Sequence, residues 1–165
     1  MGQPSGKIVF PSSFNEYIAV EHATSEFLSY YGCSFADTSS DTVTLPLRHG
    51  IQDFDYKRGY LEEFVLKTGS GIEKHDFTHL DCPLEENSGF FLLGEMYDED
   101  EIHLTAFKIP SLHTLYVPRG CIHSNDYLQG IWRTMLSDEA DIDHVTLVKK
   151  VNGGKEQKRF HFKFN

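Results

Sequence analysis

The feature that most restricts the fold is the stretch 109–126, in which a short strand is expected to run into a rigid turn. Side chains alternate along a strand, so a strand over 113–117 places alternate residues on one face. Pro118 removes a backbone donor and ends that strand, and Gly120 permits a bend that most residues resist. The turn therefore predicts that His123 is held at the start of the next strand, with its imidazole aimed in a fixed direction.

Short strands separated by turn residues are predicted along most of the chain, at spacings of roughly ten residues. That spacing is typical of a β-sandwich or barrel, so we predict an all-β fold with little helix. We expect one domain, residues 1–165, whose residues 1–12 form an extended arm. Ser13 is expected to cap a short helix, and a strand over 17–20 is the alternative. The main predicted strands are 38–47, 61–67, 72–79, 89–96, 102–108, 113–117, 130–136, 145–151 and 158–164, the last two joined in a hairpin at Asn152 and Gly153.

The charge and composition exclude several classes of partner. Fifteen Lys and Arg residues against 25 Asp and Glu residues give a formal net charge of −10. A surface of that charge repels phosphate backbones and anionic membranes, so we expect neither nucleic acid nor a membrane as partner. No apolar run approaches the roughly 20 residues of a membrane helix, and residues 1–10 lack a signal-peptide core. The three widely spaced cysteines argue against a disulfide framework, which favours a reducing, cytoplasmic location.

The spacing of Pro118, Gly120 and His123 resembles the second conserved motif of the cupin superfamily. Leu112 stands where cupins usually have a glycine, and Tyr127 stands where they often have an asparagine. The resemblance covers the middle of the chain and identifies no single family within the superfamily. It implies the cupin double-stranded β-helix, a jelly-roll barrel that takes a small-molecule ligand or substrate in its interior, and it implies that the chain can form a homodimer.

Cupins typically hold a metal ion inside the barrel, with two histidines and a carboxylate from a first motif and one histidine from the second. Residues i and i+2 of a strand share a face about 6.6 Å apart, close enough for two side chains to converge on one ion. The alignment that we prefer for the first motif supplies His79, Asp81 and Glu86. The resemblance thus implies that these three residues and His123 bind a divalent metal ion, Fe, Mn, Ni or Zn.

A second alignment of the first motif begins at Gly69 and takes His75 as the first histidine. Phe77 then replaces the second histidine, and Asp81 supplies the carboxylate. Residues i and i+4 of a regular strand lie about 13 Å apart, so His75 and His79 would need a bulge between them to bind one ion. On a regular strand His75 shares the face of His79 and would line the same cavity.

These assignments lead to three hypotheses about function. The first is a metal-assisted cupin enzyme that acts on a small polar metabolite by isomerase, lyase or dioxygenase chemistry. His75 or His113 would be its catalytic residue and move a proton, while the ion would polarise a carbonyl or enolate oxygen or hold O₂. The alternatives are a metal-free sugar epimerase or isomerase of the same fold and a non-catalytic cupin that binds a small molecule.

Overall fold

The computed structural model describes residues 6–36, 50–56, 60–136 and 142–165, and over these ranges the chain is mostly β, as predicted. The predicted strand over 38–47 lies outside the described residues. The helical segments are α1 (Ser25–Tyr30), η1 (Leu61–Val65), α3 (Leu66–Thr68) and η2 (Asn152–Gly154). The strands are β1 (Gly6–Phe10), β2 (Tyr17–Ile18), β3 (Val20–His22), β4 (Ser34–Phe35), β5 (Ile51–Tyr56), β6 (Gly71–His75), β7 (His79–Pro83), β8 (Phe91–Met96), β9 (Ile102–Lys108), β10 (Leu115–Val117), β11 (Ile122–Ser124), β12 (Gly130–Leu136), β13 (Ile142–Val151), β14 (Glu156–Arg159) and β15 (Lys163–Phe164).

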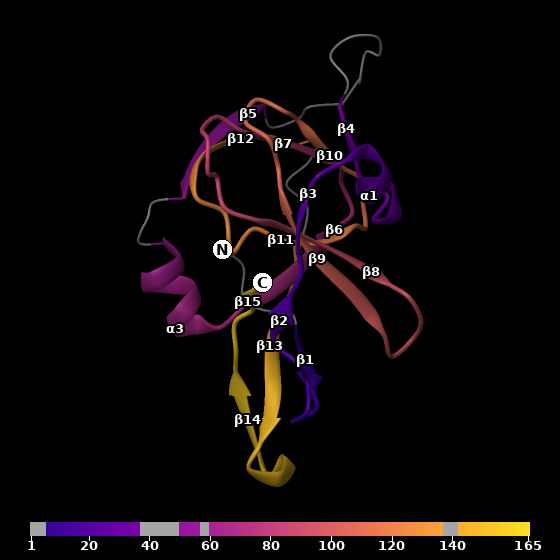
Figure 1. Ribbon diagram of the computed structural model, residues 1–165, viewed down its shortest axis with the longest axis vertical. Coiled ribbons are helices and arrows are strands. Elements are labelled where there is room, and N and C mark those ends of the chain that lie inside the picture. The colour runs from indigo at the N-terminus through magenta and orange to yellow at the C-terminus, as the bar shows by residue number, and fades with distance from the viewer. Residues whose placement is uncertain (1–5, 37–49, 57–59, 137–141) are drawn as a thin grey trace.

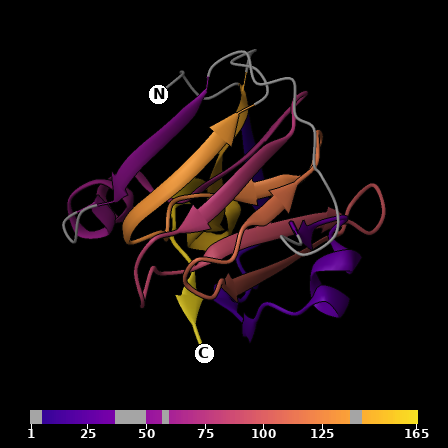
Figure 2. The ribbon, with the colours of Figure 1, turned by 90° about the horizontal axis from the view of Figure 1, so that it is seen from above.

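Within the described ranges, the strands form two large sheets and one short pair (Figure 1). The first sheet has the order β1-β13-β6-β11-β8-β9-β3, with β14 paired to β13, and the second has the order β4-β10-β7-β12-β5. The short pair is β15-β2. The view from above (Figure 2), like Figure 1, places α1 and the η1–α3 segment on opposite sides of the strands.

Two apolar clusters cover the opposite faces of the first sheet. Phe91 and Leu93 of β8 belong to one cluster, and Leu92 between them belongs to the other. The cluster of Phe91 and Leu93 also contains Leu115 and Trp132 from the second sheet, so it forms the core between the sheets. The other cluster packs the outer face of the first sheet against segments from both ends of the chain.

Strands with clear alternation or strong turn signals are placed correctly by the sequence. The predicted strands over 102–108 and 130–136 have the same bounds as β9 and β12. The predicted hairpin is confirmed for β13 and β14, which pair from Val148 to Arg159. Its second strand is shorter than predicted, because the chain leaves β13 after Arg159 and Lys163–Phe164 pairs with β2 instead.

The predicted strand over 61–67 is wrong, because η1 and α3 make this segment helical. Leu61, Phe64 and Val65 recur at the spacing of a helical face, and Val65 is fully buried. Gly69 ends the helix with a φ of 82°, and its N–H donates to the carbonyl of Val65 at 2.8 Å. The helical spacing of the apolar residues and the terminal glycine are the local signals of this helix.

The predicted helix at Ser13 is also wrong, since β2 and β3 occupy Tyr17–Ile18 and Val20–His22. The helix of this region is α1, which begins later. The Thr24 hydroxyl oxygen accepts a hydrogen bond from the N–H of Phe27 at 3.2 Å and so caps α1.

We expect Gly89→Ala to lower the free energy of unfolding by about 2–3 kcal/mol. Gly89 has a φ of 77°, and a Cβ there would lie 2.2 Å from the carbonyl oxygen of Tyr127. Urea unfolding measures the effect. Gly153→Ala is the matched control, because Gly153 has a φ of 65° but nothing within 4 Å of its added Cβ. Equal losses in the two variants would show that the close approach at Gly89 contributes nothing.

Candidate metal centre

Three buried histidines from three strands lie together. His75 ends β6, His79 begins β7 and His123 is the middle residue of β11. The centroids of the three rings are 4.8–4.9 Å apart. One ligand atom from each residue lies within 4.8 Å of the other two, a separation at which three imidazoles can bind one metal ion.

The first sheet directs His75 and His123 towards the core between the sheets. Residues paired across neighbouring strands share a face, and His123 pairs with Leu93 on one side and Glu73 on the other. Leu93 belongs to the core between the sheets, so His123 and Glu73 face that core. His75 lies two positions after Glu73 on β6 and therefore faces it too.

The second sheet directs His79 towards the same interior. Asp81 pairs with Leu115, a residue of that core, and His79 lies two positions before Asp81 on β7. A regular strand would hold His75 and His79 about 13 Å apart. The chain instead leaves the first sheet after His75 and enters the second at His79, so a bend at 76–78 brings the two rings together.

The hydrogen bonds of the three imidazoles involve Nδ1 in every case. His75 Nδ1 lies 3.1 Å from the carbonyl oxygen of Phe77, and His123 Nδ1 lies 3.1 Å from that of Cys121. His79 Nδ1 bonds to Asp81 Oδ2. Because carbonyl and carboxylate oxygens only accept, each neutral ring carries its proton on Nδ1 and presents Nε2 as an acceptor.

Two of these Nε2 atoms are buried and lack a hydrogen-bond partner within the described ranges. Among the described residues, the Nε2 atoms of His79 and His123 have no hydrogen-bond partner. Glu73 Oε1 lies 3.4 Å from His123 Nε2, within ion-pair distance but without hydrogen-bond geometry. A buried polar atom without a partner is costly, and a metal ion bound by the lone pairs would remove that cost.

The pKa values also favour a neutral ring at His75. Burial, together with the charges of His123 and His79, lowers the pKa of His75 to about 4, so this ring is neutral at pH 7. Burial also acts to lower the pKa of His123, but the Glu73 carboxylate outweighs it and raises that pKa. A metal ion would have to compete with a proton at His123 and would meet an unprotonated ring at His75.

Asp81 lies behind His79 rather than beside the Nε2 atoms. Both oxygens of this buried carboxylate are occupied, Oδ2 by His79 and Oδ1 by the Thr134 hydroxyl at 2.6 Å. Burial acts to raise the pKa of Asp81, but the attraction of His79 and the two hydrogen bonds lower it overall, so Asp81 is ionised. This arrangement of a carboxylate behind a ligating histidine fixes the orientation of the ring.

The structure does not bring the other two sequence candidates into the group. Glu86 is exposed and lies in the turn that follows β7, which ends at Pro83. His113 is exposed and precedes β10, with its Nδ1 3.1 Å from the carbonyl oxygen of Ser111.

Two polar residues beside the histidines were missed by the sequence analysis. Asn125 Nδ2 donates to Glu73 Oε1 at 3.2 Å, so both residues lie at the edge of the group. Glu73 precedes His75 by two positions and Asn125 follows His123 by two, so the strand period was a signal for both. Asp126, a neighbour of Glu73, accepts a hydrogen bond from the N–H of Gly71, and burial raises its pKa to about 6.

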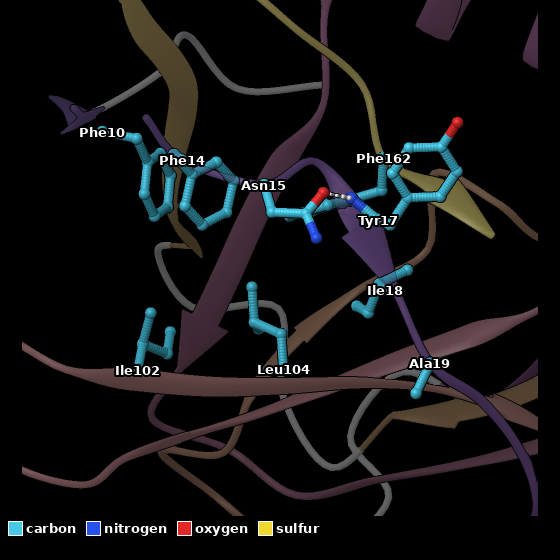
Figure 3. A pocket seen from close by; sticks show the side chains of 9 residues that line it. All are labelled: Phe10, Phe14, Asn15, Tyr17, Ile18, Ala19, Ile102, Leu104 and Phe162. Atoms are coloured by element: carbon cyan, nitrogen blue, oxygen red, sulfur yellow. Dashed lines mark hydrogen bonds between the residues drawn. The ribbon is translucent and has the colours of Figure 1, made fainter. Parts of the chain in front are cut away.

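A separate hollow lies on the other side of the first sheet, against the outer cluster (Figure 3). In Figure 3 the stacked rings of Phe10 and Phe14 lie above Ile102 and Leu104. The described residues that line it include no histidine, cysteine or carboxylate, the side chains that most often bind metal ions.

No protein-family model matches this chain, and a search of curated proteins finds no similar sequence. Over the ranges that the structure describes, no helix has the length and apolar character needed to cross a membrane.

Proposed function

We propose that this chain is a metal-dependent enzyme of the cupin type that acts on a small polar metabolite. The observation that carries the proposal is the convergence of three buried imidazoles whose Nδ1 atoms are all engaged by acceptors. The cupin assignment is supported by the backbone at Leu112, where cupins usually have a glycine. Leu112 has a φ of 61°, the left-handed conformation that glycine adopts most readily.

The three histidines are the metal ligands of this proposal. His75, His79 and His123 would bind through Nε2, and Asp81 would hold His79 in place instead of binding the ion itself. Three imidazoles suit Zn, Fe, Mn or Ni and leave coordination positions for a substrate. When bound, such an ion supplies Lewis-acid polarisation of a carbonyl or enolate oxygen.

Glu73 would transfer the proton in this site. Its Oε1 lies 3.4 Å from His123 Nε2, and its side chain is 20% exposed, so the carboxylate lies between the buried imidazoles and solvent. Burial acts to raise the pKa of Glu73, but His123 lowers it overall, which keeps the carboxylate ionised and able to accept a proton. Asn125 holds the same oxygen and would orient it.

The proposal is tested by the metal content of protein purified without a chelator or a nickel column. We expect one divalent ion per chain, and we expect the chelator-treated protein to gain thermal stability when Fe, Mn, Ni or Zn is returned, because a ligand of the folded state stabilises it. His123→Ala should abolish both results. His113→Ala is the matched control and should retain both, since His113 lies outside the group. Wild-type protein that carries no ion, and whose melting temperature none of the four metals changes, would refute the proposal.

A further inference from the structure

Two cysteines distant in sequence form a thiol pair close to the histidines. Cys33 lies between α1 and β4, and Cys121 lies between Gly120 and β11. Their Sγ atoms are 3.5 Å apart, and both residues are buried, with exposed fractions of 2% and 9%. All three cysteines of the chain are free thiols, and the third, Cys82, has its Sγ against the carbonyl oxygen of Pro83.

The two thiols already face each other. Each Sγ lies 3.6 Å from the same carbonyl oxygen, that of Tyr31. A disulfide has an S–S distance of about 2.05 Å, so the two sulfur atoms would have to approach by about 1.5 Å. Both cysteines lie in connections between elements, each directly after a glycine with a positive φ, Gly32 or Gly120, where a small backbone shift breaks no sheet pairing.

The pair is connected to the histidine group through the backbone of Cys121. The carbonyl oxygen of Cys121 lies 3.1 Å from His123 Nδ1 and sets the orientation of that ring. A shift of Cys121 towards Cys33 would therefore move the acceptor that directs Nε2 of His123. The same residue is thus a potential partner in a disulfide and the support of a proposed metal ligand.

We propose that Cys33 and Cys121 are a modification site at which a peroxide forms a reversible disulfide, and that this disulfide weakens metal binding by the three histidines. The disulfide is independent of the proposed function, whereas its effect on metal binding rests on it. The sulfur of Cys121, the more exposed of the two, attacks one oxygen of hydrogen peroxide, which breaks the O–O bond and gives a sulfenic acid and water. The sulfur of Cys33 then displaces the hydroxyl group, so the S–S bond forms and a second water leaves. Two thiols lose two electrons and two protons, and one peroxide is reduced.

The disulfide is tested by mass spectrometry of the full chain after treatment with hydrogen peroxide. We expect two of the three thiols to become resistant to alkylation, and we expect a cross-linked peptide that joins Cys33 to Cys121. Dithiothreitol should fully reverse both changes. Cys82→Ser should give the same cross-link, and Cys121→Ser should give none. Three thiols that stay reactive, or sulfinic acid at Cys121 without a cross-link, would overturn the proposal.

The effect on the metal site is tested by Zn²⁺ titration of the reduced and the oxidised chain. We expect the oxidised chain to bind Zn²⁺ 10- to 100-fold more weakly, the range for loss of a group that supports a ligand. The Cys33→Ser variant, which cannot form the disulfide, should keep the affinity of the reduced chain in the presence of peroxide. Equal affinities of the oxidised and reduced chains would overturn this part of the proposal. Failure of the reduced chain to bind Zn²⁺ would overturn it together with the proposed function, while the mass spectra would still decide whether the disulfide forms.

Discussion

Replacing His79 with alanine is expected to lower the free energy of unfolding of the metal-free protein by about 3–5 kcal/mol. Asp81 is 4% exposed and ionised, and His79 supplies one of its two described side-chain hydrogen bonds. Without the imidazole, a buried negative charge would keep only the Thr134 hydroxyl. Chemical denaturation in the presence of a chelator measures this loss without any contribution from a metal.

The double variant His79→Ala/Asp81→Asn is the control for the origin of that loss. An amide at position 81 carries no charge, so the double variant should regain most of the stability that the single variant loses. If His79→Ala lowers the free energy of unfolding by less than about 1 kcal/mol, or if the second substitution restores nothing, the buried pair does not hold this part of the second sheet.

The metal-free protein is expected to lose stability between pH 6.5 and pH 4, and replacing His75 with glutamine is expected to make that loss about 3 kcal/mol smaller. An unfolded histidine binds its proton near pH 6.5, whereas burial lowers the pKa of folded His75 to about 4. The unfolded state therefore takes up a proton first as the pH falls, so His75 makes the protein less stable as the solution becomes acidic. Because the group is buried, solvent screening reduces this contribution little.

The measurement is the free energy of unfolding at pH 7 and at pH 4, for the wild type and the variant. Glu73 raises the pKa of His123, which makes the protein more stable as the pH falls. This effect is present in both proteins and cancels in the comparison. His113→Gln is the matched control, because His113 is exposed and outside the group, and it should lose as much stability as the wild type. A His75→Gln variant with the pH dependence of the wild type would show that burial does not lower the pKa of His75.

The parts of the fold that the sequence predicted are those with local causes. Pro118 and Gly120 define the turn before His123 within a few residues, and β9 alternates clearly enough to fix its bounds. The helical segment at 61–68 was missed because its short apolar pattern fits both periods, and only packing of Val65 into the outer cluster decides between them.

The candidate site, like the fold, was predicted only in part. The sequence indicated that His79, Asp81, Glu86 and His123 bind one ion and that His75 lines the same cavity. It did not reveal that Glu86 lies outside the group, nor which side chains point their ligand atoms at one another. That distinction depends on the bend at 76–78, where the chain passes from one sheet to the other, and on the hydrogen bond from Thr134 that turns Asp81 away. The bend depends on the pairing of β6 and β7 in different sheets, and the Thr134 hydrogen bond joins β12 to β7. Both therefore depend on contacts with distant segments, which residue spacing alone does not reveal.

The central claim is that three imidazoles bind one divalent ion through Nε2, and the X-ray absorption spectrum of the Zn²⁺-loaded protein tests it most directly. We expect a nitrogen shell at about 2.0–2.1 Å with the outer-shell scattering of three imidazole rings, and fewer rings in His123→Ala. A first shell of sulfur, a shell with no imidazole scattering, or a spectrum that His123→Ala leaves unchanged would contradict the claim.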